Sequence, residues 1–559
     1  MSYPFDRRRF LELAGLGAIA VAGGGLVAGC GDAKTSSGPG TTDQNQLQKL
    51  LPAYVASSSV KPDIASVQGA NGFFSDPVFL SYPANPVTTS TGVPGKGGTY
   101  TTTTPLWGAI PSSSGNTYYE TVNKALGTNL KMQPADGNNY DKVLPTLFAG
   151  NKLSDWIQIP SWNMPNLGFS DAVNKFADLG PYLSGDAVKA YPNLAAIPTS
   201  AWQCCIWNGK LYGLPVYYGG ATIAGMLMYR KDIFDKEGIN ADEVKTPDDL
   251  AALGKQLTSA SAGRWAFDDI FDSLGQPFKF PVDPNRWVID ESGKIVHRFE
   301  LPGYVEALEW AHKAALAGYV HPDALADKTQ EGKQRFWSGK VAVTGDGPGA
   351  WKGDDAKSGQ ASNPTYNRQA FKLLSTDGKP QMFMNPSAGM YSFLNAKLSA
   401  DQIKECLSVA DYLAAPYGSA EFLTVNYGQA GTDYTIVDAN PQLTEKGSKE
   451  VQTTYQFLVT PLTPTTVIAG YTQVTKDYAA WQADMVKYAV KPAFYGMNIT
   501  EPPQYSKLNQ PVTDTVKDVR FGRKPVSAFQ DALKTWQSQG GNALRAFYED
   551  IRTKYGTGQ

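Results

Sequence analysis

Cysteine and histidine are scarce in this sequence, which has four cysteines and three histidines in 559 residues. None of them has the spacing of a zinc site, and neither His-Glu-x-x-His nor Gly-x-Ser-x-Gly occurs. The sequence therefore gives no support to the common zinc hydrolases or to hydrolases with a nucleophile elbow. It contains no motif from which a catalytic residue, a metal site or a cofactor would be predicted.

Charge is also low, at 18% of residues, and the formal net charge is −2. Residues 1–29 contain three arginines and two acids, so the chain that follows them carries about −3. Nucleic-acid partners are not expected, because they require a surplus of basic residues. Two or more lobes are expected, because a chain of this length exceeds one small core.

The chain has one long apolar run, and it lies in the leader. Asp6-Arg7-Arg8-Arg9-Phe10-Leu11 matches the twin-arginine export pattern, and the apolar run extends from Leu13 to Ala28. This run is shorter than the roughly 20 residues of a transmembrane helix and is rich in glycine and alanine. Val27-Ala28-Gly29-Cys30 is a lipobox. We expect cleavage after residue 29 and lipidation (palmitate) at Cys30, which would anchor the protein outside the cytoplasmic membrane.

The other three cysteines are expected to be buried free thiols. Cys204 and Cys205 are adjacent, and Cys406 lies on the apolar face of a predicted helix. A bridge between Cys204 and Cys205, or from either of them to Cys406, stays open, since export places the protein in an oxidising compartment.

Aromatic residues are abundant, at 12% of the chain with 29 tyrosines and 12 tryptophans. They occur together with many glycine, proline, threonine and asparagine residues. Such a mixture suits loops that present flat apolar faces beside amide groups, as sugar-binding sites do.

Two segments precede the first lobe. Residues 30–50 are rich in serine, glycine and threonine without a period, which predicts a flexible tether. Residues 51–97 combine many prolines with several aromatic residues, so we expect an extended arm laid over a lobe.

The order of elements from residue 98 predicts a mainly parallel sheet. We expect strands at 99–106 and 129–133, helices at 118–126 and 140–149, and another strand near 153–157. Trp107 follows the first strand at its carboxyl end, where open α/β sheets bind their ligands, and Trp162 lies in the loop beyond the third.

Residues 207–232 predict the crossover between lobes. Asn208-Gly209 indicates a hairpin turn, and residues 223–229 form an apolar run of strand length. Tyr217-Tyr218-Gly219-Gly220 lies between them, two aromatic faces beside two conformationally free residues, which suits a hinge that carries binding groups.

Several motifs in their order resemble those of a known family. They are Asn-Gly-Lys-x-Tyr-Gly-Leu-Pro at 208–215, Tyr-Arg-Lys-Asp at 229–232, Tyr-Val-His-Pro-Asp at 319–323, Phe-Trp-Ser-Gly-Lys-Val-Ala at 336–342, and the segment from 426 to 447. Together they resemble the extracellular solute-binding lipoproteins of carbohydrate ABC importers, in particular the large oligosaccharide-binding type of Gram-positive bacteria. The resemblance covers roughly residues 98–559.

The resemblance implies a two-lobed, periplasmic-binding-protein-like α/β fold of type II (maltose-binding-protein-like), with discontinuous lobes joined by a hinge. Residues 98–216 would form the first part of lobe 1 and 217–382 the first part of lobe 2. Residues 383–416 would return to lobe 1, and 417–559 would complete lobe 2 with C-terminal helices. The protein would be a monomer that presents an oligosaccharide to the transmembrane subunits of an importer.

The expected ligand-binding residues come from two sources: their positions after strands or in loops, and the family resemblance. Trp351 follows a strand and a glycine-rich turn, at the position where the family places an aromatic sugar platform, and Asp155 would face the cleft. The full set is Trp107, Asp155, Trp156, Trp162, Tyr217, Tyr218, Trp351, Asn385, Tyr391 and Tyr427.

Two other classes of function remain open from the sequence. A secreted, lipid-anchored glycoside hydrolase or lyase needs two carboxylates placed across a sugar ring, and sequence cannot show such a placement. A binder of a non-sugar solute, such as a peptide, would have the same fold.

Overall fold

The computed structural model describes residues 44–217, 219–282, 286–328, 331–352, 359–360, 363–467, 471–499 and 501–557. The leader, Cys30 and Tyr218 lie outside the described residues. Among the described residues, no helix is both long and apolar enough to cross a membrane.

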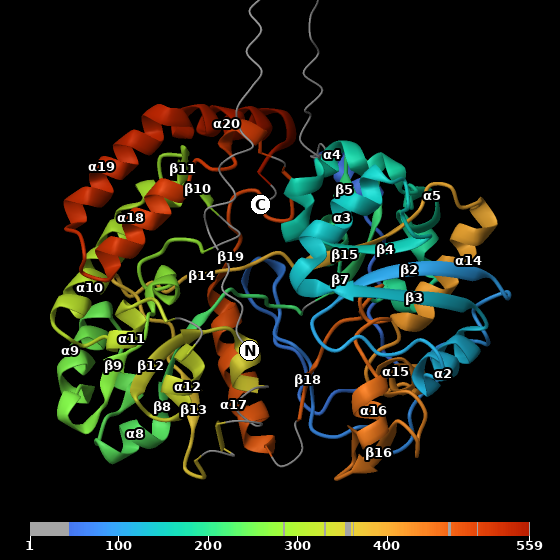
Figure 1. Ribbon diagram of the computed structural model, residues 1–559, viewed down its shortest axis with the longest axis horizontal. Coiled ribbons are helices and arrows are strands. Elements are labelled where there is room, and N and C mark those ends of the chain that lie inside the picture. Colours follow the sequence, from blue (N-terminus) through green and yellow to red (C-terminus); the bar gives the residue numbers. More distant parts are fainter. Residues whose placement is uncertain are drawn as a thin grey trace, which may run out of the picture. The chain divides into compact units, whose positions relative to one another are not determined.

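A five-stranded sheet in the order β3-β2-β4-β15-β7 is the centre of what we call the first lobe (Figure 1). The predicted parallel arrangement is confirmed for its first three strands, whereas β15 runs antiparallel to both neighbours. The strands are β2 (Thr99–Leu106), β3 (Asn129–Asp136), β4 (Trp156–Pro160), β7 (Gly213–Tyr217) and β15 (Ala388–Leu394).

The helices of the first lobe begin and end where their side chains satisfy the free backbone groups. Asn116 caps α2 by accepting the Tyr119 N–H, and Gly127 ends the helix in a left-handed conformation. Ser399 and Gln402 form a capping box at the start of α14. The longer helices are α2 (Thr117–Leu126), α3 (Tyr140–Ala149), α14 (Ala400–Leu413), α15 (Ala420–Tyr427) and α16 (Glu445–Glu450).

Short elements complete this lobe. They are α4 (Phe169–Ala172), α5 (Gly180–Leu183), α6 (Pro192–Ala195), α7 (Thr199–Gln203), and the hairpins β5 (Ile206–Trp207) with β6 (Lys210–Leu211) and β16 (Tyr434–Val437) with β17 (Asn440–Leu443). Asn208 and Gly209 both have positive φ in the first hairpin, as the Asn-Gly signal predicts.

A four-stranded mixed sheet in the order β13-β8-β12-β9 is the centre of the second lobe. Thr246 and Asp249 form a capping box at the start of α9 (Pro247–Leu257). The strands are β8 (Met226–Arg230), β9 (Trp265–Phe267), β12 (Val341–Asp346) and β13 (Arg368–Ala370). The helices are α8 (Lys231–Lys236), α9 (Pro247–Leu257), α10 (Pro302–Leu316), α11 (Pro322–Leu325) and α12 (Gly332–Trp337), and β10 (Trp287–Ile289) pairs with β11 (Ile295–His297).

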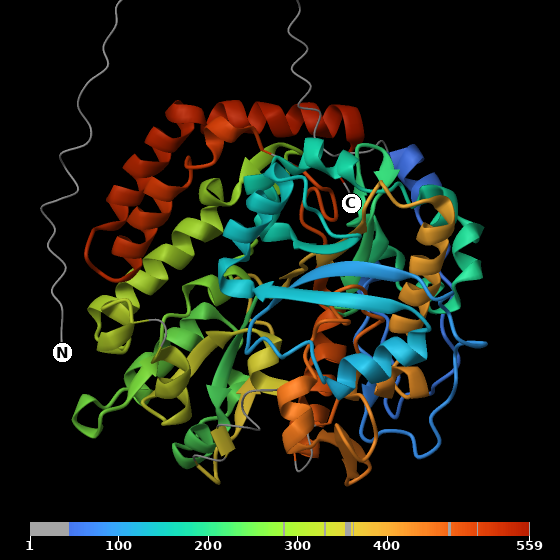
Figure 2. The ribbon, with the colours of Figure 1, turned by 45° about the vertical axis from the view of Figure 1, so that its right-hand side comes forward.

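The last three helices share the core of the second lobe, whereas the helix before them, α17 (Thr472–Met485), packs in a separate apolar cluster with Met226 and Met382. Val516, Phe529 and Leu544 lie in the same apolar cluster as Leu308 of α10. The helices are α17 (Thr472–Met485), α18 (Gln510–Arg520), α19 (Val526–Trp536) and α20 (Asn542–Tyr555), and Figure 2 shows the last three in red along one side of the lobe. A break at Gly540-Gly541 lies between α19 and α20.

Two expected boundaries are corrected. Leu47 of α1 (Gln44–Leu50) is buried in the first-lobe core, so the predicted tether already folds onto the lobe from residue 44. Val425, Tyr455 and Leu458 also belong to that core, although residues from 417 on were expected in the second lobe. Because α15 and α16 pack on α2, the final crossing falls after residue 459.

The arm at residues 51–97 contacts the segments that cross between the two sheets. Its strand β1 (Val78–Phe79) pairs with β18 (Thr465–Thr466), and Asp76 Oδ1 accepts the Gly220 N–H. A second crossing strand, β14 (Met382–Phe383), pairs with β19 (Ala489–Val490). A Cβ atom at Gly220 would lie 2.4 Å from the Phe74 carbonyl oxygen, so the close approach of the arm requires a glycine there.

Candidate functional site

The carboxyl ends of β2, β3 and β4 meet at one edge of the five-stranded sheet, because these strands are parallel neighbours. Three turns follow at this edge: residues 107–116 after β2, 137–139 after β3, and 161–167 after β4. The predicted site residues Trp107 and Trp162 lie in the first and third of these turns. The edge therefore brings together two indoles that are 55 residues apart in sequence.

Trp107, Trp162 and Phe457 form a partly exposed aromatic cluster, which we call the Trp107 group. The ring centroids of Trp107 and Trp162 are 6.2 Å apart, and those of Trp107 and Phe457 are 5.8 Å apart. Trp107 is 44% exposed and Trp162 is 54% exposed, although both are large apolar side chains. Exposure of two adjacent indoles is typical of a binding surface.

Gly137 supports the indole of Trp107. A Cβ atom at this position would lie 2.5 Å from Cε2 of Trp107, so any larger residue would displace the ring. The turn after β3 thus lies directly against the indole that follows β2.

Polar groups stand beside this indole. Asp136, the last residue of β3, accepts hydrogen bonds from the Asn138 N–H (3.0 Å) and from the side-chain amides of Asn138 (3.2 Å) and Asn139 (2.6 Å). These bonds, led by that of Asn139, lower the pKa of the Asp136 carboxyl. The site therefore pairs an apolar platform with an ionised acceptor.

Asp136 and Phe457 are absent from the residues expected from sequence. Asp136 ends a parallel strand as Leu106 does, but the strand was expected to end at residue 133 and extends to Asp136 in the structure, so the argument that identified Trp107 did not reach it. Phe457 was not found either, because its segment was expected in the other lobe.

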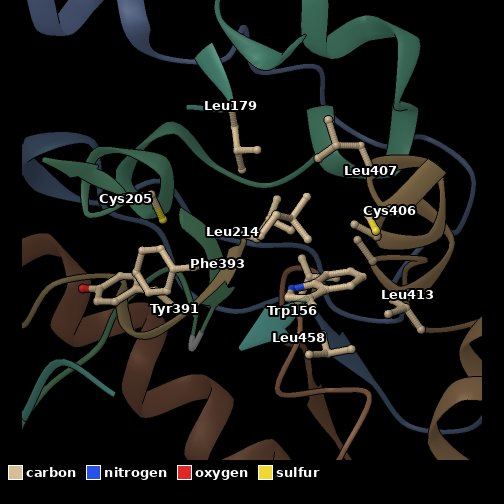
Figure 3. Packing of buried hydrophobic residues seen from close by; sticks show 14 of the residues in the cluster. Trp156, Leu179, Cys205, Leu214, Tyr391, Phe393, Cys406, Leu407, Leu413 and Leu458 are labelled. Carbon is tan, nitrogen blue, oxygen red and sulfur yellow. The ribbon is translucent and has the colours of Figure 1, made fainter. Parts of the chain in front are cut away.

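Trp156 and Tyr391 were expected to bind the ligand, but both lie in the core of the first lobe (Figure 3). Trp156 is fully buried, and its Nε1–H donates to Ser392 Oγ at 2.7 Å. Tyr391 is 3% exposed, donates its hydroxyl to the Ala388 carbonyl and contacts Trp207 edge to face. Both residues are in strands of the central sheet, where their side chains meet covering elements and leave no surface for a ligand.

Trp351 also lies in a core, which corrects the expected sugar platform. Its side chain is 1% exposed, and its ring contacts Tyr478 and Trp481 of α17 at 5.8 and 6.3 Å. Met226 and Met382 belong to the same apolar cluster. Trp351 follows the glycine-rich turn as expected, but α17 packs on its ring and leaves no face of the indole for a ligand.

The polar residues expected at the site have structural partners. Asp155 precedes β4, so it lies at the amino end of that strand, and it accepts hydrogen bonds from the N–H and hydroxyl of Thr101, each at 2.8 Å. Asn385 donates its N–H to the Thr222 carbonyl, which joins two crossing segments. The ring centroid of Tyr427, in α15, is 5.8 Å from that of Tyr434, and burial raises the pKa of the Tyr427 hydroxyl.

Tyr217 ends β7, at the same edge of the sheet as the Trp107 group. Tyr218 lies outside the described residues, so its place in the site stays a prediction.

The second lobe carries ion pairs at the corresponding strand ends. Asp346 ends β12 and pairs with Arg368 at 3.4 Å. Asp269 follows β9 and pairs with Arg520 at 2.8 Å. These carboxylates and guanidiniums are fixed donors and acceptors at the carboxyl ends of two parallel strands.

The thiols are free and buried, as expected for structural cysteines. Cys204, Cys205 and Cys406 form no disulfide, and burial raises the pKa of Cys204 to about 11. Figure 3 shows Cys205 and Cys406 on different sides of the first-lobe core. Within the described ranges, no group of histidine, cysteine, aspartate and glutamate side chains could hold a metal ion.

Comparisons with known proteins agree with this architecture. The polygalacturonan/rhamnogalacturonan-binding protein YtcQ of Bacillus subtilis is 24% identical over 439 residues, which cover 74% of this chain and 83% of YtcQ. Lipoprotein LipO of the same organism is 22% identical over 450 residues, covering 76% and 86%.

Solved structures show the same fold. A solute-binding protein of Bifidobacterium longum infantis, associated with an HMO-binding ABC transporter, matches with a TM-score of 0.60 and 12% identity, covering 82% of this chain and 99% of its own. The alginate-binding protein AlgQ2 without calcium ion matches with a TM-score of 0.57 and 16% identity, covering 83% and 98%. The expected two-lobed type II α/β fold is thereby confirmed. A family model matches residues 111–421, more than half of the chain, and the protein belongs to the bacterial extracellular solute-binding protein family.

Proposed function

We propose that this protein binds an oligosaccharide on the Trp107 group and delivers it to an ABC importer. The observation that carries the proposal is the exposure of Trp107 and Trp162, which lie side by side at the carboxyl edge of the first-lobe sheet. A sugar ring has a flat face of C–H groups and a rim of hydroxyls. An indole stacks on that face, while Asp136 and the neighbouring asparagines hydrogen-bond the rim.

The names of relatives support a carbohydrate ligand. YtcQ is named for polygalacturonan and rhamnogalacturonan, and another relative, 26% identical over 161 residues, is the arabinooligosaccharide-binding protein of Bacillus subtilis. The bound sugar would lie between the two lobes, so that the strand ends of both contact it. The polar residues of the second-lobe edge, Asp346 and Asp269 with their arginines, would face it.

The anchor and the route of export form part of the proposal. Arg7 and Arg8 would direct twin-arginine export, and a lipid on Cys30 would hold the protein as a monomer at the outer face of the cytoplasmic membrane. The relative named Lipoprotein LipO supports the anchor.

The proposal is tested by screening neutral and acidic oligosaccharides for thermal stabilisation, followed by calorimetry of those that bind. Trp107→Ala and Trp162→Ala should each weaken binding by about thirtyfold or more, since truncation of an aromatic anchor costs about 2 kcal/mol or more. Tyr54→Ala is the matched control, because Tyr54 is 49% exposed in the arm. If every oligosaccharide fails to bind, or if both tryptophan variants bind as the parent does, the proposal is wrong.

The two rival functions have direct tests. Shorter products after prolonged incubation with a glycan that binds would indicate a hydrolase or lyase. Stabilisation by a peptide library, with none by oligosaccharides, would indicate a peptide-binding protein.

A further inference from the structure

We propose that Asp136 is a specificity-determining residue that selects uncharged sugars over anionic ones on the Trp107 group. This inference rests on the proposed function and adds the chemical class of the ligand. It concerns one carboxylate whose position, hydrogen bonds and charged surroundings are all defined by the structure.

The backbone places Asp136 next to the indole. Asp136 pairs with Leu106 in the parallel register of β2 and β3, and Trp107 is the residue after Leu106. Gly137, the residue after Asp136, lies against the Trp107 ring. The backbone of Asp136 therefore lies next to the segment that carries the platform. The proposal places its carboxylate at the rim, where the hydroxyls of a stacked sugar would lie.

The carboxylate is held in place and still has a free acceptor position. A carboxylate offers about four acceptor directions, and the three hydrogen bonds from Asn138 and Asn139 use three of them. The side chain of Asp136 is exposed, so a sugar hydroxyl can reach the remaining one. A bond from a hydroxyl to an ionised acceptor is stronger than one between neutral groups.

The surrounding charges disfavour an anionic sugar. The turns at this edge, residues 107–116, 136–139, 161–169 and 453–464, all lie in the described part of the chain and contain no lysine, arginine or histidine. Lys142 is a nearby cation whose charge also lowers the pKa of Asp136, and its Nζ donates to Asn139 Oδ1 at 2.9 Å, the asparagine that holds Asp136. A uronate stacked on Trp107 would bring a second carboxylate toward Asp136, and the arginines of the second-lobe edge, Arg368 and Arg520, are already paired with Asp346 and Asp269.

The test uses a matched pair of glycans. The tightest-binding oligosaccharide from the screen is converted chemically, by oxidation of its C6 hydroxyls or by reduction of its carboxylates, so that the pair differs only in charge. Binding of both members is measured by calorimetry to the parent, to Asp136→Asn and to Asp186→Asn. Asp186 is the control because it is an exposed first-lobe carboxylate with 80% side-chain exposure.

We expect the parent to bind the neutral member at least about tenfold more tightly, and Asp136→Asn to reduce this preference by about tenfold. Asp186→Asn should leave it unchanged. Raising the salt from about 0.01 M to about 0.5 M should narrow the preference of the parent, because salt screens the repulsion between carboxylates.

Equal or tighter binding of the anionic member by the parent would overturn the inference, as would an unchanged preference in Asp136→Asn. If Trp107→Ala no longer binds either glycan of the pair, while Asp136→Asn shows the same preference between them as the parent, the proposed function stands and the inference falls. If no oligosaccharide binds at all, the proposed function and the inference fall together.

Discussion

The Asp76 carboxylate accepts a hydrogen bond from the backbone N–H of Gly220 at 2.9 Å, across 144 residues of sequence. The same aspartate exchanges two hydrogen bonds with the Gln482 side chain of α17, at 2.7 and 3.0 Å. Burial raises the pKa of this carboxyl, and the bonds from Gln482 and Gly220 oppose that shift. The arm before the first lobe is thus tied to a crossing segment and to a helix that follows the last crossing.

Asp76→Ala should destabilise the protein. The substitution leaves the Gly220 N–H and one N–H of the Gln482 amide buried without their partner, although that amide keeps its bonds to the Tyr478 hydroxyl and to the backbone N–H of residue 76. A buried group without its partner costs about 1–3 kcal/mol. We expect the free energy of unfolding to fall by about 2 kcal/mol or more, measured by urea denaturation. Asp186→Ala is the control, and equal stability of the two variants would show that the arm contact adds nothing.

Trp351→Ala should also act on stability. Its fully buried indole fills a cluster with Tyr478 and Trp481, and a tryptophan truncated in a core costs about 3–5 kcal/mol. Trp162→Ala, at a residue 54% exposed, should cost far less. The two variants are compared by their unfolding temperatures, measured without ligand. A parent-like unfolding temperature for Trp351→Ala would refute its place in the core.

Asp411 should make stability depend on pH. Burial raises its pKa from 3.8 to about 6, although its carboxylate accepts the N–H groups of Asn193 and Leu194. Because the folded pKa is the higher one, the contribution of Asp411 to stability is complete below about pH 4 and is lost as the pH rises through 6.

Asp411→Asn cannot ionise and keeps an acceptor for both N–H groups. Between about pH 4 and about pH 7.5 it should therefore gain about 2–3 kcal/mol of stability relative to the parent. Urea unfolding across this range measures the difference. If the free energy of unfolding depends on pH in the same way for parent and variant, the raised pKa of Asp411 is contradicted.

Cys30→Ser should release the protein from the membrane. The lipid requires the thiol, and a serine at this position cannot form the thioether. Fractionation of cells and incorporation of labelled palmitate are the measurements, with Thr35→Ala as a nearby control that keeps Cys30. Undiminished membrane association of Cys30→Ser would exclude lipidation as the anchor.

Ligand binding should compact the protein. If the crossing segment at Gly219 and Gly220 is part of a hinge, a saturating oligosaccharide should lower the radius of gyration measured by small-angle scattering. Trp107→Ala at the same ligand concentration is the control. An unchanged radius for the saturated parent would argue against closure of the lobes.

Local signals in the sequence determined much of the fold. The alternation of strands and helices after residue 98 and the Asn208-Gly209 turn hold in the structure, where Asn116, Thr246 and Ser399 cap their helices through local hydrogen bonds. Each of these depends on residues a few positions apart, so the sequence alone contains the physical cause. Trp107 could be placed because a residue that ends a parallel strand lies at the edge of its sheet, whatever the rest of the chain does.

Only the tertiary structure decided which of the strand-end tryptophans faces solvent. Trp107 and Trp351 both follow strands, yet the first is 44% exposed and the second 1%. The difference comes from α17, which lies more than 120 residues beyond Trp351 and covers it. Packing between segments far apart in sequence also places residues 420–459 in the first lobe and brings Asp76 to Gly220. Burial depends on distant elements that pack onto a site, and no local pattern in the sequence specifies which elements those are.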